Sequence, residues 1–145
     1  MQYATLREEK KFWKRGHSIV ACVDEAGRGP LAGPVVAAAV CLSPKPRKLS
    51  LTKFNLIKLS FPRMRDSKKL SPKRREEIYV KILSHPNIQW GIGTVSEKII
   101  DRINIFHATQ FAMRKALRAL HKKLSAQHIT KSSYSKKRLY VDFLI

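Results

Sequence analysis

The chain has 145 residues and a mass of 16.6 kDa, the size of one compact domain, and 43% of its residues are hydrophobic. Its 30 Lys and Arg residues against 10 Asp and Glu residues give a formal net charge of +20. This excess favours a polyanionic partner, nucleic acid first and an acidic membrane surface second. No apolar run reaches the ~18 residues of a membrane-spanning helix, and the N-terminus lacks the apolar core of a signal peptide. We therefore expect a cytoplasmic protein with no membrane-spanning segment.

The N-terminal part of the sequence predicts one helix and two strands. Residues 3–14 carry apolar side chains among charges and predict a short amphipathic helix. Two apolar, β-branched runs, residues 19–23 and 35–42, predict strands. The residues between them favour a tight irregular turn, and they are Gly27, Gly29, Pro30, Gly33 and Pro34. Cys22 and Cys41 lie inside these strands and are expected to be buried hydrophobic residues, not disulfide or zinc ligands.

Two consecutive acids, Asp24 and Glu25, lie where the first strand meets the turn. Neighbouring residues of a regular strand point to opposite faces, so we expect both acids to serve one site only where the strand becomes irregular. Gly27 and Gly29 are expected to produce that irregularity and to let the backbone approach a phosphate or sugar. Arg28 between them offers a planar cation. The alternative is an ordinary solvated turn, which is the commoner role of such an acidic pair.

A basic stretch and a helix follow. Residues 43–75 contain twelve Lys or Arg residues and a single acid, Asp66, and predict an exposed connection. It is either a solvated face or a loop that contacts phosphates. Ser71 suits a helix N-cap and Pro72 the first helical position, and the helix is expected to end at residues 85–87. Its expected apolar face consists of Ile78, Tyr79, Ile82 and Leu83.

The next elements are a third strand and a pair of helices. Residues 88–94 alternate with a period of two, and Gly91 and Gly93 within them indicate that another element packs closely. From Ser96 the pattern predicts a short helix through Ile100 and then a longer helix. Asn104 is expected to cap the longer helix rather than to contact substrate. The expected apolar stripe of that helix is Ala108, Phe111, Ala112, Ala116, Ala119 and Leu120.

The C-terminal part returns to basic residues and then to a strand. Residues 121–138 are rich in Ser and Lys, and no acid occurs between Asp101 and Asp142. We read them as a second basic connection. Residues 139–145 are apolar apart from Asp142 and Tyr140, and they predict a fourth strand.

Asp24, Glu25 and Asp142 are the candidate catalytic and metal-binding residues, because each is an acid at or in an apolar strand. Two divalent cations can supply what phosphodiester hydrolysis needs, namely an attacking hydroxide, charge neutralisation and a stabilised leaving oxygen. Mg²⁺ prefers oxygen ligands, so a few carboxylates at strand ends suffice to hold such a pair. If the strand containing Asp142 lies parallel to the strand containing Asp24, with helices as the crossover, the acids converge at one sheet edge.

Residues 24–34, Asp-Glu-Ala-Gly-Arg-Gly-Pro-Leu-Ala-Gly-Pro, resemble the signature segment of the ribonuclease HII family. Residues 66–71, Asp-Ser-Lys-Lys-Leu-Ser, are similar to a second motif of that family, and residues 103–109 to a third. The resemblance covers roughly residues 10–145. It implies an α/β, ribonuclease H-like fold with a mixed central sheet flanked by helices, incomplete at the C-terminus. It also implies that residues 1–145 form a single, partial catalytic domain.

The resemblance assigns roles to individual residues. It implies that Asp24, Glu25 and Asp142 bind Mg²⁺ or Mn²⁺, and that the segment Gly27, Arg28 and Gly29 senses the ribose 2′-hydroxyl. It places Lys68 near the substrate backbone. The implied enzyme is a monomeric endonuclease that cuts the RNA strand of RNA/DNA hybrids, and ribonucleotides embedded in duplex DNA, by two-metal-ion hydrolysis.

The sequence departs from the family pattern at two places. Phe143 stands where the family usually has Gly, and the chain ends before the family's fourth carboxylate and a later tyrosine-bearing helix. We therefore expect a C-terminally truncated enzyme whose own activity is weak or absent. The main alternative is a non-catalytic, basic nucleic-acid-binding module. A basic ribosome-associated structural protein ranks last, because it explains the charge but not residues 24–34.

Overall fold

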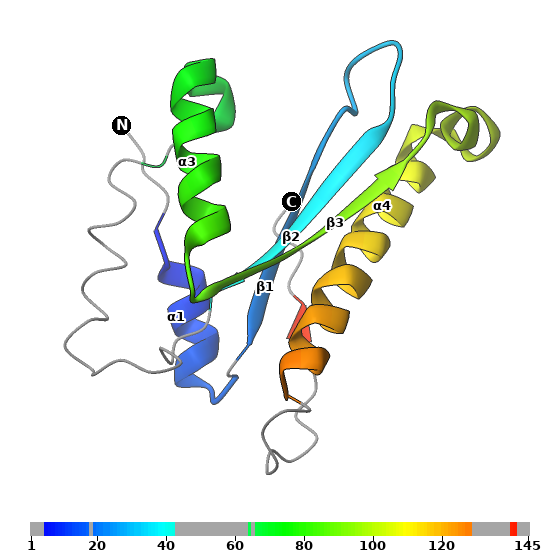
Figure 1. Cartoon of the computed structure of the whole chain (residues 1–145). Helices are drawn as coiled ribbons and strands as arrows, with labels where there is room; N and C mark the ends of the chain where they lie inside the picture. The colour runs from blue at the N-terminus through cyan, green and yellow to red at the C-terminus, as the bar shows by residue number, and fades with distance from the viewer. Residues whose placement is uncertain (1–4, 18, 43–63, 65, 129–139, 142–145) are drawn as a thin grey trace. The chain divides into compact units, whose positions relative to one another are not determined.

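The structure, a computed structural model, describes residues 5–17, 19–42, 64, 66–128 and 140–141 (Figure 1). The chain divides into two compact units, one of Met1–Ile19 with Ser43–Ile88 and one of Val20–Leu42 with Gln89–Ile145. Each unit is described by itself, and the single-domain organisation of residues 1–145 stays a prediction. None of the helices within the described ranges is long and apolar enough to cross a membrane.

The first unit contains helices α1 (Arg7–Lys14) and α3 (Pro72–Ser84) and a short 3-10 helix, η2 (Ser67–Lys69). The start of α3 is as predicted: Ser71 Oγ accepts a hydrogen bond from the Arg74 N–H at 3.3 Å, and Pro72 is the first helical residue. The helix also ends at the predicted place, with His85 as its C-cap. The helix predicted over residues 3–14 begins at Arg7 in the structure. Residues 3 and 4 of the predicted range lie outside the described residues.

The predicted apolar face of α3 is only partly covered, and this expectation was wrong in part. Ile78 is buried and Ile82 is intermediate, but Tyr79 is 53% and Leu83 43% exposed. Successive residues of a helix are separated by about 100°. The four predicted residues therefore span a wider arc of the helix surface than one packing contact buries. Helical spacing therefore identified the buried position of α3 but overestimated the width of its buried face.

The second unit is built on a four-stranded sheet with the order β3-β2-β1-β4. Its strands are β1 (Val20–Ala26), β2 (Val35–Leu42), β3 (Ile88–Val95) and the described pair of residues in β4 (Tyr140–Val141). β1 pairs antiparallel with β2 and parallel with β4. The predicted α/β fold class and mixed central sheet are confirmed. The rest of the expected fourth strand, residues 139 and 142–145, lies outside the described residues.

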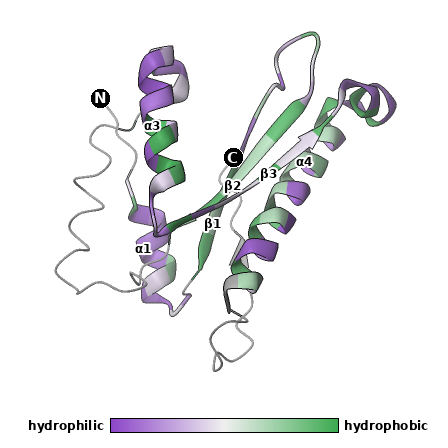
Figure 2. Ribbon diagram, in the orientation of Figure 1, coloured by the Kyte–Doolittle hydropathy of each residue, from purple (hydrophilic) through white to green (hydrophobic). Residues whose placement is uncertain are grey.

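Helix α4 (Glu97–His128) covers one face of this sheet (Figures 1 and 2). The helix contributes fully buried side chains from Ala108, Ala112, Ala116 and Leu120, and the sheet contributes Val35, Ala37 and Ala39. Small residues on both surfaces let the two backbones approach closely. Gly91 and Gly93 show how close: a Cβ at either position would collide with backbone atoms of α4. The predicted close packing against the third strand is confirmed.

Asn104 interrupts α4 as the sequence predicted. Its backbone has φ 65° and ψ 166°, outside the helical region, so the element consists of two helices joined at a kink. The Asn104 side chain accepts a hydrogen bond from the His107 N–H at 3.1 Å, which is the geometry of an N-cap. The capping role predicted for Asn104 is therefore confirmed, and the first helical piece extends slightly past the expected end at Ile100.

Candidate active site

Asp24 and Glu25 lie within β1, not beyond its end. The pairing with β2 runs without interruption through Asp24↔Ala38, Glu25↔Ala37 and Ala26↔Val36. The strand therefore stays regular at both acids, and their expected position at the turn is wrong. The break expected from Gly27 follows directly, because β1 ends at Ala26 and Gly27 has a positive φ.

A regular strand directs the two acids to opposite faces of the sheet. Glu25 shares a face with Ala21 and Val23, which are buried beneath α4. Its side chain is 19% exposed, whereas Asp24 belongs to the exposed class and shares the other face with Cys22. Any cation held by both carboxylates must therefore lie beyond the carboxyl end of β1, where the longer Glu side chain can reach around the strand.

The hydrogen bonds of the two acids leave oxygen atoms available. Asp24 Oδ1 accepts from the Glu25 N–H at 2.9 Å. Glu25 Oε1 lies 3.5 Å from Arg28 Nη1, at the limit of a hydrogen bond, and Arg28 itself is 54% exposed. Pairs of this exposure contribute little to stability, so Arg28 is free to turn toward an anion. The two carboxylates offer the hard oxygen ligands that Mg²⁺ and Mn²⁺ prefer, so the residues present fit these metals.

The loop between β1 and β2 has three glycines. Gly27 and Gly33 have a positive φ that favours glycine, and Gly29 does not. Gly27 has φ +90°, and a Cβ there would collide with the Pro34 carbonyl oxygen. Gly29 has no positive φ, and a Cβ added to it would meet no atom within 4 Å. Leu31, two residues further on, is completely exposed at 108%. The fold therefore requires glycine at position 27, whereas position 29 has room for a side chain.

Asp142, the third predicted ligand, lies outside the described residues, as does Phe143. Among the residues that are described, no group of three or more His, Cys, Asp or Glu side chains could hold a metal. The parallel arrangement expected of the first and fourth strands is nevertheless confirmed, with Val20 level with Tyr140 and Ala21 level with Val141. Parallel neighbours have their carboxyl ends at the same edge of a sheet, so β4 runs toward the edge that carries Asp24 and Glu25.

Lys68, the predicted backbone-contacting residue, belongs to the first unit and lies in η2. Its backbone is held tightly: Asp66 Oδ1 accepts from the Lys68 N–H at 3.0 Å. Arg75 Nη1 donates to the carbonyl oxygens of Ser67, at 3.2 Å, and Leu70, at 2.7 Å. Sequence reasoning treated Asp66 as surface charge and assigned no role to Arg75. Spacing alone could not find these bonds, because Arg75 reaches them only after the chain has turned into α3.

Two other acids pair with cations on their own helices. Lys11 Nζ lies 2.8 Å from Glu8 Oε1, and Arg74 Nη1 lies 2.7 Å from Glu77 Oε2. The hydrogen bond from Lys11 lowers the pKa of Glu8, and the hydrogen bond from Arg74 lowers that of Glu77. The cysteines also carry free thiols as expected, although only Cys41 is fully buried and Cys22 is intermediate.

A model of the ribonuclease HII family matches residues 21–142, which include Asp24, Glu25 and Asp142. The chain belongs to the ribonuclease HII family. It is 48% identical over 112 residues to the ribonuclease HII of Lactobacillus delbrueckii subsp. bulgaricus, covering 77% of this chain and 38% of that protein. It is 43% identical over 125 residues to the ribonuclease HII of Chlamydia trachomatis serovar A, covering 83% of this chain and 52% of that protein.

The ribonuclease HII relatives are longer than the matched region. Across the two proteins just named, the chain spans between 38% and 52% of the relative's length. The crystal structure of the ribonuclease H2 from Pyrococcus horikoshii OT3 is also similar, with 31% identity and a TM-score of 0.44. That alignment covers 64% of this chain and 41% of the other. The family model and the two ribonuclease HII relatives confirm the family resemblance predicted from residues 24–34 and 66–71.

Proposed function

We propose that this chain supplies the first metal-binding acids of a metal-dependent endonuclease. Its substrates are the RNA strand of RNA/DNA hybrids and ribonucleotides embedded in duplex DNA. The observation that carries the proposal is the parallel pairing of β1 with β4, which directs the chain from Val141 toward the edge where Asp24 and Glu25 lie. Family membership supports the same reaction class. Mg²⁺ or Mn²⁺ bound there would supply the attacking hydroxide and neutralise the charge on the phosphate.

The sequence gives Asp142 a place in this proposal. It directly follows Val141, which pairs in parallel with Ala21 of β1. We propose Asp142 as the third metal ligand beside Asp24 and Glu25, because all three lie in the region that the family model matches.

The loop after β1 suits contact with a ribose. Gly29 leaves its surroundings open, so a sugar can approach the backbone where any side chain would stand in the way. Arg28 is half-exposed and only weakly engaged by Glu25, and it can donate to a phosphate in two parallel bonds. Lys68, whose backbone N–H donates to Asp66, would supply a positive charge for the nucleic-acid backbone.

The first experiment tests the metal-binding acids with two readouts. One is cleavage of a duplex that contains a single ribonucleotide, in Mg²⁺ or Mn²⁺. The other is calorimetric binding of Mn²⁺, which does not depend on turnover by this chain. We expect Asp24→Asn to abolish cleavage and to weaken Mn²⁺ binding at least tenfold, about 1.4 kcal/mol. The matched control is Glu76→Gln, an exposed acid on α3. Cleavage that persists in excess chelator, or equal Mn²⁺ affinity in both variants, would contradict the proposal.

The second experiment tests the loop. Gly29→Ala adds a methyl group that meets no atom within 4 Å among the described residues, so the variant should be at least as stable as the wild type. We expect it to lose affinity for the ribonucleotide-containing duplex and to keep its affinity for the all-DNA duplex. Unchanged discrimination between the two duplexes would show that the loop does not read the 2′-hydroxyl.

A second candidate function is a nucleic-acid-binding module without catalysis, and the net charge of +20 favours it. It predicts a steep loss of binding with salt and no preference for hybrid over DNA duplex. The monomeric state and the cytoplasmic location stay predictions.

A further inference from the structure

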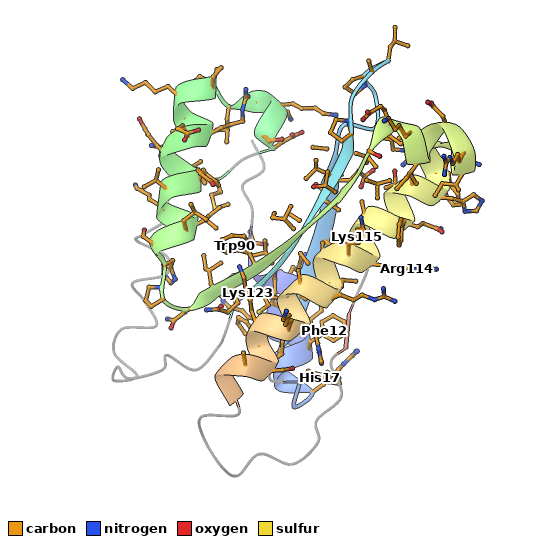
Figure 3. The ribbon with its side chains drawn as sticks, turned by 45° about the vertical axis from the view of Figure 1, so that its right-hand side comes forward. Phe12, His17, Trp90, Arg114, Lys115 and Lys123 are labelled. Atoms are coloured by element: carbon orange, nitrogen blue, oxygen red, sulfur yellow. The ribbon has the colours of Figure 1, made fainter. Side chains whose placement is uncertain are left out.

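Two lysines of helix α4 contact β3, the edge strand of the sheet. Lys115 Nζ donates to the Thr94 carbonyl oxygen at 2.9 Å, which occupies a backbone acceptor of the edge strand β3. Lys123 Nζ lies 3.3 Å from the centroid of the Trp90 ring, a close cation–π contact (Figure 3). These two lysines therefore have structural partners on β3.

Three cations in the part of α4 after Asn104 have no such partner among the described residues. Arg114, Arg118 and Lys122 are exposed and follow one another at intervals of four residues, so they form a single row along the helix, here called the α4 basic row. Arg114 points away from β3 in Figure 3. Within the described ranges, none of the recorded ion pairs or side-chain hydrogen bonds involves these three side chains. At 1.5 Å of rise per residue, the row is about 12 Å long.

In α1 and α3, by contrast, a cation pairs with an acid on the same helix. In α1 Lys11 pairs with Glu8, and in α3 Arg74 pairs with Glu77. On α4 no acid follows Asp101 in the sequence before Asp142, so nothing on the helix balances the row. Like charges four residues apart repel by roughly 0.2–0.5 kcal/mol per pair. The row thus slightly destabilises α4, which is the pattern expected of a surface that meets a polyanion.

The row also lies on a different side from the candidate active site. Ala112 and Ala116 of α4 are buried against the sheet, and Arg114 is about 200° around the helix from Ala112. The row therefore faces away from the sheet. Asp24 projects from the sheet face that α4 does not cover. The helix and the sheet stand between the two, so one phosphate group cannot contact both.

We propose that the α4 basic row binds backbone phosphates of a nucleic-acid duplex at a second surface, separate from the site of Asp24 and Glu25. Such a contact reads no sequence, because phosphates carry none. Its effect is to keep the protein on a duplex without placing that segment at the catalytic acids. An anionic membrane would also attract the row, but a membrane-binding helix needs an apolar face beside its basic face, and the apolar face of α4 is buried on the sheet.

The test measures binding of the chain to an all-DNA duplex by fluorescence anisotropy, in chelator and without any ribonucleotide. The variant is Arg114→Gln/Arg118→Gln/Lys122→Gln. The matched control removes the same charge from exposed positions on helices that carry acids, Lys10→Gln/Lys73→Gln/Lys81→Gln. Each phosphate contact contributes about 0.9 to the slope of log K against log salt between about 50 and 200 mM. We expect the row variant to lower that slope by about 2 to 3 and the affinity at least tenfold.

The control should lower the affinity less than threefold. Equal losses in the two triple variants would overturn the proposal, because net charge alone would then explain the binding. Arg114→Lys/Arg118→Lys should keep the wild-type slope, and circular dichroism of every variant checks that α4 is intact. Loss of binding to phosphatidylserine vesicles without loss of duplex binding would also overturn it. Since neither metal nor ribonucleotide is present, these outcomes are independent of whether the chain cleaves RNA.

Discussion

Replacing Gly93 by Ala tests the close contact between β3 and α4. A Cβ at this position would collide with the Ala112 carbonyl oxygen and the Ala116 amide nitrogen, and it would lie 2.7 Å from Lys115 Cβ. The first two atoms are helix backbone, which cannot rotate away. Ordinary contact begins near 3.4 Å, so α4 must move from β3 by about 1 Å.

The energy follows from what that movement separates. Ala112 and Ala116 are fully buried on the sheet, and a gap of 0.5–1 Å forfeits roughly a quarter to a half of each dispersion contact. Overpacking of this kind costs about 1–3 kcal/mol, or more where backbone is involved. Alanine would recover about 0.5–1 kcal/mol in backbone entropy. Because both clashes are with helix backbone, the upper end of that cost applies. We therefore expect a net loss of about 2–2.5 kcal/mol, which lowers Tm by roughly 4–10 °C for a chain of this size.

Thermal and urea unfolding followed by circular dichroism measure the loss. Gly29→Ala is the matched control, because the same methyl group there meets nothing within 4 Å, and its Tm should equal or exceed that of the wild type by up to about 4 °C. A Gly93→Ala protein as stable as the wild type would refute the packing described here. So would an equal loss in Gly29→Ala.

Three further changes test other parts of the chain. Asn104→Ala should destabilise by about 1–3 kcal/mol in urea unfolding, and Asn104→Gly by much less, because only Ala both loses the cap and is strained at φ 65°. Burial raises the pKa of the Cys41 thiol to about 11, so a thiol reagent at pH 8 should modify Cys22 first and Cys41 only as fast as the chain unfolds. Burial lowers the pKa of His85, so the unfolded state binds its proton more readily and stability should fall as pH drops below about 6.5. This loss of stability at low pH should be smaller in His85→Asn. An identical dependence of stability on pH in the wild type and the variant would contradict the role given to His85.

Features set by local chemistry could be predicted from the sequence. Ser71 and Pro72 fix the start of α3, and Asn104 fixes the kink in α4, because a cap depends on residues within one turn. Gly91 and Gly93 indicated a close neighbour, because few other reasons exist for glycine in a strand. The end of β1 could not be predicted. Whether Asp24 and Glu25 belong to the strand depends on its pairing with β2. The partners in β2 lie more than ten positions away in the sequence.

The regular pairing of β1 changes how the acids would act. Because both acids lie in the paired part of β1, opposite Ala38 and Ala37, their Cα positions are held by the sheet and not by the turn. A change in the glycine-rich loop should therefore alter substrate contact while leaving Asp24 and Glu25 in place. The position of a third ligand depends instead on the pairing of β1 with β4, at Val20–Tyr140 and Ala21–Val141. Under the proposed function, metal affinity and ribose discrimination would reside in different parts of the chain, and substitutions in β4 and in the loop should separate them.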